Sequence, residues 1–510
     1  MSKLVNLIEN ALKKDNEFTH TANGALARTS TGNKVYDFFA FAGAQRRDPD
    51  LVLKEFIAAY YESPLYAVKA LFWLRDCKEG AGERDLFRTC FTWLMCNELY
   101  FASDLIPLIP TYGRWDDLFI ILDAYSTCVG NTTFEKSIYK NLVYKQLIAD
   151  MESEHPSLCG KWLKSINTSS IESRRLAKKA IKFLGLSNKE YRKMLTILRK
   201  KIKIVEAQMS ANDWDAIDFS AVPSQANIKY ASCFRTREET ASRYADFINS
   251  KESKIHAATL YPYQLANEAV HKPINDATTN KLWAALPDYC NGSDKNILCV
   301  ADTSGSMTGY DASAPIYSSI ALATYCAERN KGLFHNCYIT FSENPQVVKL
   351  DSRNTIAEQL RWIYQHTINA NTDLNAVFDL ILDVAIQNKL PKSEMPESIV
   401  VISDMQIDEA TSSWRYTHRR WTSGTAVTEM EQIREKWQLK GYKLPHLIYW
   451  NVNAAKPVIL DKGPDVTFVS GLAPTHFKAI CSGLTGIDLM YETLDAERYD
   501  AIAEVWNKVS

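Results

Sequence analysis

Three oxygen-bearing side chains stand two residues apart in the segment 302–306. Asp302, Ser304 and Ser306 follow the apolar run 297–301, which has the composition of a buried parallel strand. A carboxylate and two hydroxyls at this spacing in a turn can point their oxygens at one centre. Hard divalent cations such as Mg²⁺ prefer oxygen ligands. The pattern therefore predicts a metal site, with the alternative that Asp302 and the two serines only cap the following helix.

A single carboxylate supplies too little charge for tight binding, so further ligands are expected from other strand ends. Thr372 lies at the start of a predicted helix, and Asp404 follows the predicted strand 398–403. In open α/β sheets the loops after the strands meet at one edge, where ligands bind. We therefore predict that Mg²⁺, or another hard divalent cation, is held by Asp302, Ser304, Ser306, Thr372 and Asp404.

Strands and helices alternate along the chain after residue 295. Strands are predicted at 297–301, 337–341, 398–403, 447–452 and 466–470, with 345–350 as an antiparallel edge. Helices are predicted at 317–329 and 374–385. This alternation predicts a mostly parallel, doubly wound sheet, in which the carboxyl ends of the strands position the metal ligands.

The chain before residue 288 has a different pattern. Apolar residues recur at spacings of three and four, and short turns separate the repeats, which predicts helices of about 12–18 residues packed loosely like HEAT repeats. Residues 288–295 form the expected linker. The expected fold class is thus α plus α/β, with an α-helical repeat domain over 1–288 and an α/β domain over 295–510.

The metal pattern resembles the metal-ion-dependent adhesion site of von Willebrand factor A domains. The shared features are D-x-S-x-S after a strand, then a loop Thr, then an Asp at a later strand end. The resemblance implies that Ser304, Ser306 and Thr372 contact the ion, that Asp302 and Asp404 act through water, and that a protein partner adds a carboxylate. One departure concerns Thr372, which follows Asn-Ala-Asn instead of Gly-Gly.

A second resemblance covers nearly the whole chain, and it is to Ro/TROVE proteins, which are RNA-binding helical rings closed by an A domain. It is closer still to uncharacterised TROVE-like proteins of plants, fungi and phages. The resemblance rests on the Lys254–Tyr263 stretch and on Phe38-Phe39-Ala40, Gly82-Glu83-Arg84-Asp85-Leu86-Phe87, Tyr112-Gly113-Arg114-Trp115-Asp116-Asp117-Leu118, Tyr191-Arg192-Lys193, Ser403-Asp404-Met405, Leu444-Pro445 and Trp450-Asn451. It implies that RNA is a partner and that the helices form a ring.

Residues 171–205 form the most basic helical stretch, with twelve Lys or Arg and two Glu around one apolar stripe. Such a surface would bind phosphates without sequence preference. The alternative is a solvated helix face, or one paired with acidic groups elsewhere in the chain. The candidate RNA-binding residues are Arg174, Arg175, Lys178, Lys179, Lys182, Arg192, Lys193, Arg199, Lys200, Lys201 and Lys203.

Two further segments bear on partners. Residues 114–117 correspond to an RNA-facing region of Ro/TROVE proteins, but Asp116 and Asp117 would repel phosphate; alternatively Trp115 is a core residue and Asp116 caps a helix. Residues 409–430 interleave aromatics with arginines, which suits RNA, a protein partner or a domain interface equally. The candidate contacts in this loop are Trp414, Arg415, Tyr416, Arg419, Arg420 and Trp421.

Composition restricts the remaining possibilities. The net charge of −1 excludes a uniformly basic nucleic-acid binder, although not a local basic patch. The sequence has neither an apolar run of roughly 18–20 residues nor a signal-peptide core, and its eleven cysteines include no CxxC. These features predict a cytoplasmic protein with reduced thiols and no membrane partner.

Enzyme motifs are missing from the sequence. It has neither a phosphate-binding P-loop nor H-E-x-x-H, so only metal-assisted hydrolysis between Asp302 and Asp404 would be conceivable. We therefore expect a non-enzymatic RNA-binding ribonucleoprotein component with a divalent-metal adhesion site for an acidic group. The alternative is a metal-dependent protein adhesion or assembly module without RNA.

Overall fold

In the computed structural model the described residues are 18–20, 26–309, 315–341, 345–367, 374–405, 429–453, 459 and 465–509. They fall into two units. Unit 1 takes the described residues up to Ala70 and those from Ala257 to Ala496. Unit 2 takes Leu71–His256 and the described residues from Glu497 onward. Helix α4 (Pro64–Arg75) crosses the boundary between the two units.

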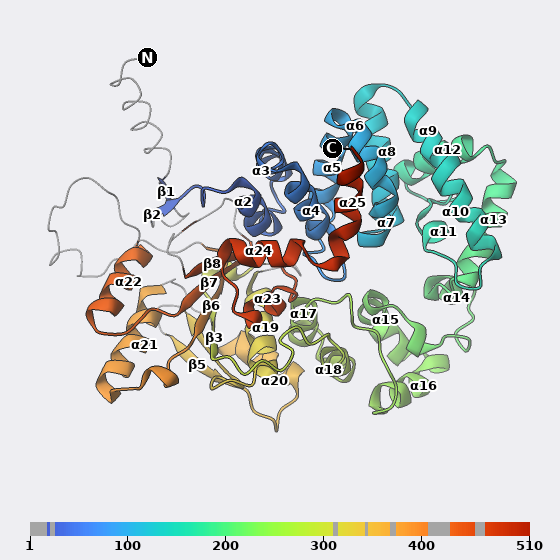
Figure 1. Cartoon of the computed structure of the whole chain (residues 1–510). Coiled ribbons are helices and arrows are strands. Elements are labelled where there is room, and N and C mark those ends of the chain that lie inside the picture. Colours follow the sequence, from blue (N-terminus) through green and yellow to red (C-terminus); the bar gives the residue numbers. More distant parts are fainter. Residues whose placement is uncertain are drawn as a thin grey trace, which may run out of the picture. The chain divides into compact units, whose positions relative to one another are not determined.

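A six-stranded sheet forms the centre of unit 1 (Figure 1). Its strands are β3 (Ile297–Asp302), β4 (Cys337–Phe341), β5 (Gln346–Lys349), β6 (Ser398–Ser403), β7 (His446–Asn451) and β8 (Val466–Ser470). They lie in the order β5-β4-β3-β6-β7-β8, and only the β4–β5 pair in this sheet is antiparallel. The mixed sheet after a helical first half confirms the α plus α/β class.

The strand order reverses between β3 and β6, because β4 and β5 lie on one side of β3 while β6, β7 and β8 lie on the other. Both central strands are buried along their whole length, as their continuous apolar sequences predict for strands covered on two faces. In a parallel sheet, such a reversal leaves a crevice at the carboxyl ends of the two strands. Asp302 ends β3 at this point, and Asp404 directly follows β6.

Helices from the N-terminal and the C-terminal segments of unit 1 cover this sheet. Helix α19 packs on β3, β4 and β6, while α2 and α24 pack on β8, where the Phe468 backbone N–H donates to the Tyr36 hydroxyl at 2.9 Å. The helices of the unit are α2 (Lys34–Phe41), α3 (Pro49–Glu62), α17 (Pro262–His271), α18 (Asp276–Ala284), α19 (Pro315–Arg329), α20 (Ile356–His366), α21 (Leu374–Asn388), α22 (Glu429–Leu439), α23 (His476–Ser482) and α24 (Gly486–Leu494). A separate antiparallel pair joins β1 (Phe18–His20) to β2 (Leu26–Arg28).

The regular secondary structure of unit 2 is helical among its described residues (Figure 1). Its helices are α5 (Asp85–Asn97), α6 (Leu99–Leu105), α7 (Ile109–Tyr112), α8 (Trp115–Val129), α9 (Thr133–Ile138), α10 (Tyr144–Glu152), α11 (Cys159–Trp162), α12 (Ile171–Leu184), α13 (Asn188–Lys201), α14 (Val205–Ser210), α15 (Ser224–Thr236), α16 (Glu238–Asn249) and α25 (Asp500–Val509). The C-terminal helix belongs here because the Trp506 ring packs 5.2 Å from the Phe101 ring and Arg498 pairs with buried Asp76.

The units are not cut where the secondary structure changes from helix to strand. The predicted domains 1–288 and 295–510 meet where the strands begin. In the structure, however, α17 and α18, which precede that point, pack with α19 and α20 and belong to unit 1. Arg361 on α20 fixes this arrangement, because its Nη2 lies 2.6 Å from Asp276 Oδ1 and its Nε donates to the Ala269 carbonyl.

None of the helices among the described residues combines the length and apolar character that crossing a bilayer requires.

A buried histidine gives unit 1 a testable pH response. The Nε2 of His476 lies 2.9 Å from the Ser470 carbonyl oxygen, and its ring packs edge-on against Trp450. Burial lowers the pKa of His476 to about 4. The unfolded chain, with a histidine pKa of about 6.5, therefore gains a proton that the folded chain resists as the pH falls from about 6.5 to 4.

We expect His476→Gln to reduce this loss of stability in acid. The glutamine amide still donates to the Ser470 carbonyl but does not titrate, so the acid-induced loss should shrink by on the order of 3 kcal/mol. Urea unfolding at neutral pH and near pH 4 measures the difference, with exposed His366→Gln as the matched control. Equal acid-induced losses in all three proteins would show that His476 does not contribute.

Candidate metal centre and nucleic-acid interface

The loops after β3 and β6 bring four of the five predicted metal ligands together. Ser304 Oγ lies 3.1 Å from Ser306 Oγ, and the Ser306 hydroxyl donates to Asp404 Oδ1 at 3.4 Å. The Asp302 and Asp404 side chains stand next to each other at the ends of paired strands, with Ala301 opposite Ile402. Both carboxylates are buried, whereas Ser306 is exposed and opens the site to solvent.

Hydrogen bonds hold the Asp302 carboxylate in place. Its Oδ1 accepts from the Ser304 backbone N–H at 2.9 Å, and its Oδ2 accepts from the Ser403 hydroxyl at 2.5 Å. Burial, and then the charge of Asp404, raise the pKa of Asp302 to about 7, although the hydrogen bonds from Ser403 and Ser304 oppose this shift. Two neighbouring buried carboxylates repel each other unless a proton or a cation lies between them. A donor set made only of oxygens fits a hard cation such as Mg²⁺.

Ser403 is a member of this cluster that sequence reasoning missed. Its hydroxyl donates to Asp302 and accepts from the Met405 backbone N–H at 2.9 Å. The signal was present, because Ser403 directly precedes Asp404 at a strand end. No side chain caps the 3₁₀ helix Gly305–Met307, which follows β3. The residues directly before the next helix, α19, lie outside the described ranges, so the helix-cap alternative stays open there.

The remaining metal and partner candidates fall outside the described residues. These are Thr372 and the loop residues Trp414, Arg415, Tyr416, Arg419, Arg420 and Trp421. Within the described ranges, no group of three or more His, Cys, Asp or Glu side chains is placed to hold a metal ion. The sheet-edge cluster contains two carboxylates and otherwise hydroxyls, so metal binding there stays a prediction.

The basic segment 171–205 is not one helix. Gly185 adopts a left-handed conformation, with φ of +71°, and ends α12, and Ser187 then caps α13 by accepting from the Glu190 backbone N–H. The predicted apolar stripe is correct for α13, where Tyr191, Leu195 and Leu198 are buried. The break means that the cations belong to two helices, each presenting its own faces.

Several of the predicted RNA-binding cations stabilise the fold instead. Arg175 and Lys179 both pair with Asp123, at 2.5 and 2.6 Å, and Lys179 also pairs with the buried Glu135. Arg174, Arg199 and Lys201 donate to backbone carbonyls of the neighbouring loops. The alternative of pairing with acidic groups elsewhere in the chain thus applies to Arg175 and Lys179, and phosphate binding by the segment stays a prediction.

A second set of cations faces solvent. Lys178, Lys182, Lys189, Lys193 and Lys200, called here the five surface lysines, are exposed and have no hydrogen-bond or ion-pair partner among the described residues. Lys178 and Lys182 share one face of α12, and Lys189, Lys193 and Lys200 share one face of α13, because each set is spaced by about whole turns. Of the remaining candidates, Arg192 donates to the Asn188 carbonyl, and exposed Lys203 lies near Asp218.

The carboxylates of the 114–117 segment are neutralised, so the predicted repulsion of phosphate does not follow. Asp117 is fully buried and pairs with Arg75 and Arg88 at 2.7 Å each. Asp116 is also buried and pairs with Lys164 at 2.6 Å. Trp115 is a core residue as expected, but Asp117, and not Asp116, caps helix α8 by accepting from the Arg114 backbone N–H.

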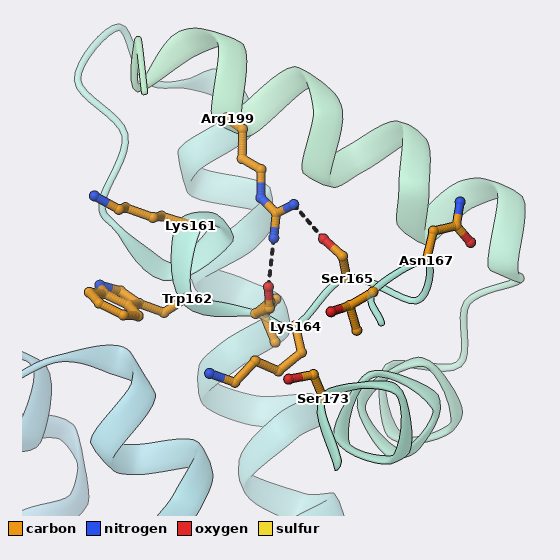
Figure 2. Close-up of a pocket in the computed structure, with 9 residues that line it drawn as sticks. Lys161, Trp162, Lys164, Ser165, Asn167, Ser173 and Arg199 are labelled. Atoms are coloured by element: carbon orange, nitrogen blue, oxygen red, sulfur yellow. Dashed lines mark hydrogen bonds between the residues drawn. The ribbon is translucent and has the colours of Figure 1, made fainter. Parts of the chain in front are cut away.

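A cavity of about 510 Å³ lies between α11, the following loop and α13 (Figure 2). Its lining residues are Lys161, Trp162, Leu163, Lys164, Ser165, Asn167, Thr168, Ser173 and Arg199. Figure 2 shows Arg199 reaching from α13 to Ser165 and the Leu163 carbonyl, with Lys161 and Trp162 extending side by side. Apart from Arg199, sequence reasoning missed this site. The available signal was two lysines flanking a tryptophan between helices.

Comparisons with known proteins match separate parts of the chain to two domains of unknown function. Residues 296–500 match a domain of unknown function (DUF7788), and residues 21–98 and 133–285 match another domain of unknown function (DUF2828). The chain is 26% identical over 501 residues to the uncharacterized protein L728 of Acanthamoeba polyphaga mimivirus, covering 90% of this chain and 84% of that protein. The crystal structure of the Ro (RSR) protein of Deinococcus radiodurans matches at 13% identity and a TM-score of 0.41, covering 89% of this chain and all of that one. At that similarity the Ro/TROVE resemblance stays a prediction.

Proposed function

We propose that this protein is a non-enzymatic RNA-binding protein, and that the five surface lysines bind the phosphate backbone. The observation that carries the proposal is their exposure without a partner among the described residues, while neighbouring cations such as Arg175 and Lys179 are consumed by ion pairs. The ion pairs thus distinguish the cations that stabilise the fold from the five surface lysines, which are available to a ligand.

Phosphates repeat along a single strand, so cations repeating along a helix face can neutralise several of them at once. Lys189, Lys193 and Lys200 provide such a row along α13. Binding of this kind releases counterions, so its affinity falls steeply with salt and depends little on sequence. The near-neutral net charge of the whole chain does not oppose it, since the segment 171–205 has twelve Lys or Arg against two Glu.

The test is whether the intact protein carries RNA. Protein purified at low salt should show a raised ratio of absorbance at 260 to 280 nm, and high salt or ribonuclease treatment should lower that ratio. Sequencing the released RNA would identify the partner. Protein that is free of nucleic acid at low salt, and that does not bind added single-stranded RNA, would overturn the proposal.

A second function is supported by the sheet-edge cluster: a metal-dependent docking site for an acidic group of a partner. Asp302, Ser304, Ser306 and Asp404 would hold the divalent ion, and exposed Ser306 leaves a side open to the partner's carboxylate. When bound, the ion would supply positive charge to the carboxylate pair and an attachment point for the partner. The cluster lies where parallel sheets commonly bind ligands.

Pull-down of partners with and without EDTA separates the two functions. A protein partner that is lost in EDTA and lost again in Asp302→Asn supports metal-dependent docking. RNA retention should be unaffected by either treatment, because the surface lysines do not use the metal. RNA that is released by EDTA as readily as the protein partner would contradict two independent sites.

A further inference from the structure

Two of the eleven cysteines are exposed, and these two contact each other. All eleven lie within the described residues; Cys96 and Cys128 are exposed, and the other nine are buried or half-buried. A hydrogen bond joins the Cys96 and Cys128 thiols. An exposed thiol is accessible to oxidants in solution. A second thiol in contact with it can then complete a disulfide, so exposure and contact together distinguish this pair.

Helices α5 and α8 hold the two sulfurs together. Cys96 is the last residue but one of α5, and Cys128 is the last but one of α8. Near the start of the same helices, Arg88 pairs with Asp117 at 2.7 Å. The two helices therefore pack side by side in the same direction, tied by an ion pair near their first turns and by the thiol contact at their last turns.

Other thiols of the chain also contact one another, but they are shielded from solvent. Cys290 contacts Cys326 and Cys481, and Cys326 also contacts Cys299. Three of these four cysteines are buried in unit 1, and Cys481 is half-buried. Reagents in solution reach such a group less readily, so oxidation of the folded protein should be selective for the exposed pair in unit 2.

The surroundings of Cys96 give the two sulfurs different roles. Partial burial, followed by the hydrogen bond with Cys128 and the charge of Cys128, raises the pKa of Cys96 to about 11. Cys96 is therefore protonated at neutral pH, and its S–H can donate to a thiolate on Cys128. Because thiolates attack disulfides and thiols do not, Cys128 is the expected attacking sulfur and Cys96 the resolving one.

We propose that Cys96 and Cys128 are a modification site that forms a reversible disulfide on reaction with a low-molecular-weight disulfide such as oxidised glutathione. In the first exchange the Cys128 thiolate bonds to one glutathione sulfur, the glutathione disulfide breaks, and one glutathione leaves as a thiolate. In the second, Cys96 loses its proton to solvent, its sulfur attacks Cys128, and the other glutathione leaves. The two leaving thiolates take up the two protons, so one oxidised glutathione becomes two reduced molecules.

The contact between the two sulfurs decides the product. The second exchange is intramolecular, and groups held in contact have a far higher effective concentration than a second glutathione molecule in solution. The mixed disulfide on Cys128 should therefore be short-lived and the protein disulfide should accumulate. Disulfides in reducing compartments are usually transient and respond to oxidation. The pair would thus couple unit 2 to the redox state around it, independently of the surface lysines on α12 and α13.

The experiment treats the folded, full-length protein with oxidised glutathione, blocks the remaining thiols with iodoacetamide, and maps disulfides by mass spectrometry of a tryptic digest. The disulfide should join the peptide 89–114 to the peptide 115–136. Fragmentation has to place the bond on Cys96, because Cys90 lies in the same peptide but is buried. Dithiothreitol should restore both thiols.

Serine variants test the two roles. Cys96→Ser should trap the intermediate, so that Cys128 keeps one glutathione. Cys128→Ser should remain unmodified at Cys96 over the same time, because the attacking sulfur is absent. Cys233→Ser removes a half-buried thiol of the same unit and is the matched control, which should form the disulfide as wild type does. Both exposed positions should tolerate serine without loss of the fold.

Three results would overturn the inference. The first is glutathione on both Cys96 and Cys128 with no bond between them, because sulfurs held in contact would have joined. The second is a pair of thiols that remains alkylatable after the treatment. The third is the same scatter of pairings in the folded protein as in urea, where all eleven thiols are free to react. None of these results bears on RNA binding, so the two proposals fail or stand separately.

Discussion

Replacing Lys182, Lys189 and Lys193 together by Glu is expected to lower the affinity for single-stranded RNA by about 100-fold at physiological salt. Each substitution removes one phosphate contact and adds a charge that repels the strand. All three lysines are exposed and make no hydrogen bond or ion pair among the described residues, so the fold should be little affected. Fluorescence anisotropy measures the affinity, and thermal melts should agree with wild type to within about 0.5 kcal/mol.

Two matched variants show whether position or charge alone matters. Lys251→Glu changes the charge of unit 2 at an exposed lysine outside α12 and α13, and should leave RNA affinity nearly unchanged. Lys201→Glu should instead destabilise unit 2, because the Lys201 ammonium donates to the Met151 and Ser153 carbonyls. If the triple variant bound RNA as wild type does, the surface lysines would not be the RNA site.

Asp404→Asn is expected to act in opposite directions with and without metal. In EDTA it should raise the stability of unit 1, because it removes a charge beside the buried Asp302 carboxylate. Saturating Mg²⁺, at a hundred times its dissociation constant, should stabilise wild type by about 2.7 kcal/mol, or roughly 5 °C in Tm, and should not stabilise the variant. Thermal unfolding in EDTA and in Mg²⁺ measures both effects.

Asp302→Asn should likewise abolish the response to Mg²⁺. The exposed acid Asp383, on α21 of the same unit, provides the control, and Asp383→Asn should keep the full response. A shift in Tm with Mg²⁺ that is equal in wild type, Asp302→Asn and Asp404→Asn would show that the ion binds elsewhere. The sheet-edge cluster would then be a hydrogen-bonded carboxylate pair and nothing more.

The sheet was predictable because its strands are short apolar runs bounded by turn residues. The strands expected at 398–403 and 466–470 have those bounds in the structure, and the antiparallel edge expected within 345–350 is β5. The same argument placed Asp302 and Asp404 at one sheet edge, since adjacent parallel strands end together. The sequence therefore predicted that Asp302, Ser304, Ser306 and Asp404 lie close together.

The basic segment was less predictable because charge does not reveal pairing. The helical spacing of apolar residues continues past Gly185, although that glycine ends α12. The spacing alone therefore does not reveal the break. Arg175 and Lys182 look alike in the sequence, but only Arg175 meets Asp123, which lies 52 residues away. The cavity was missed for the same reason, since Lys161 and Arg199 line one cavity only because α11 packs against α13.

The salt dependence of RNA binding tests the central claim most directly. For single-stranded RNA, the slope of log K against log salt concentration reports about 0.7 per phosphate neutralised. Replacing Lys182, Lys189 and Lys193 together by Gln should therefore reduce the magnitude of this slope by about 2, while Lys251→Gln leaves it unchanged. A slope that is the same in wild type and in the triple variant would contradict the account.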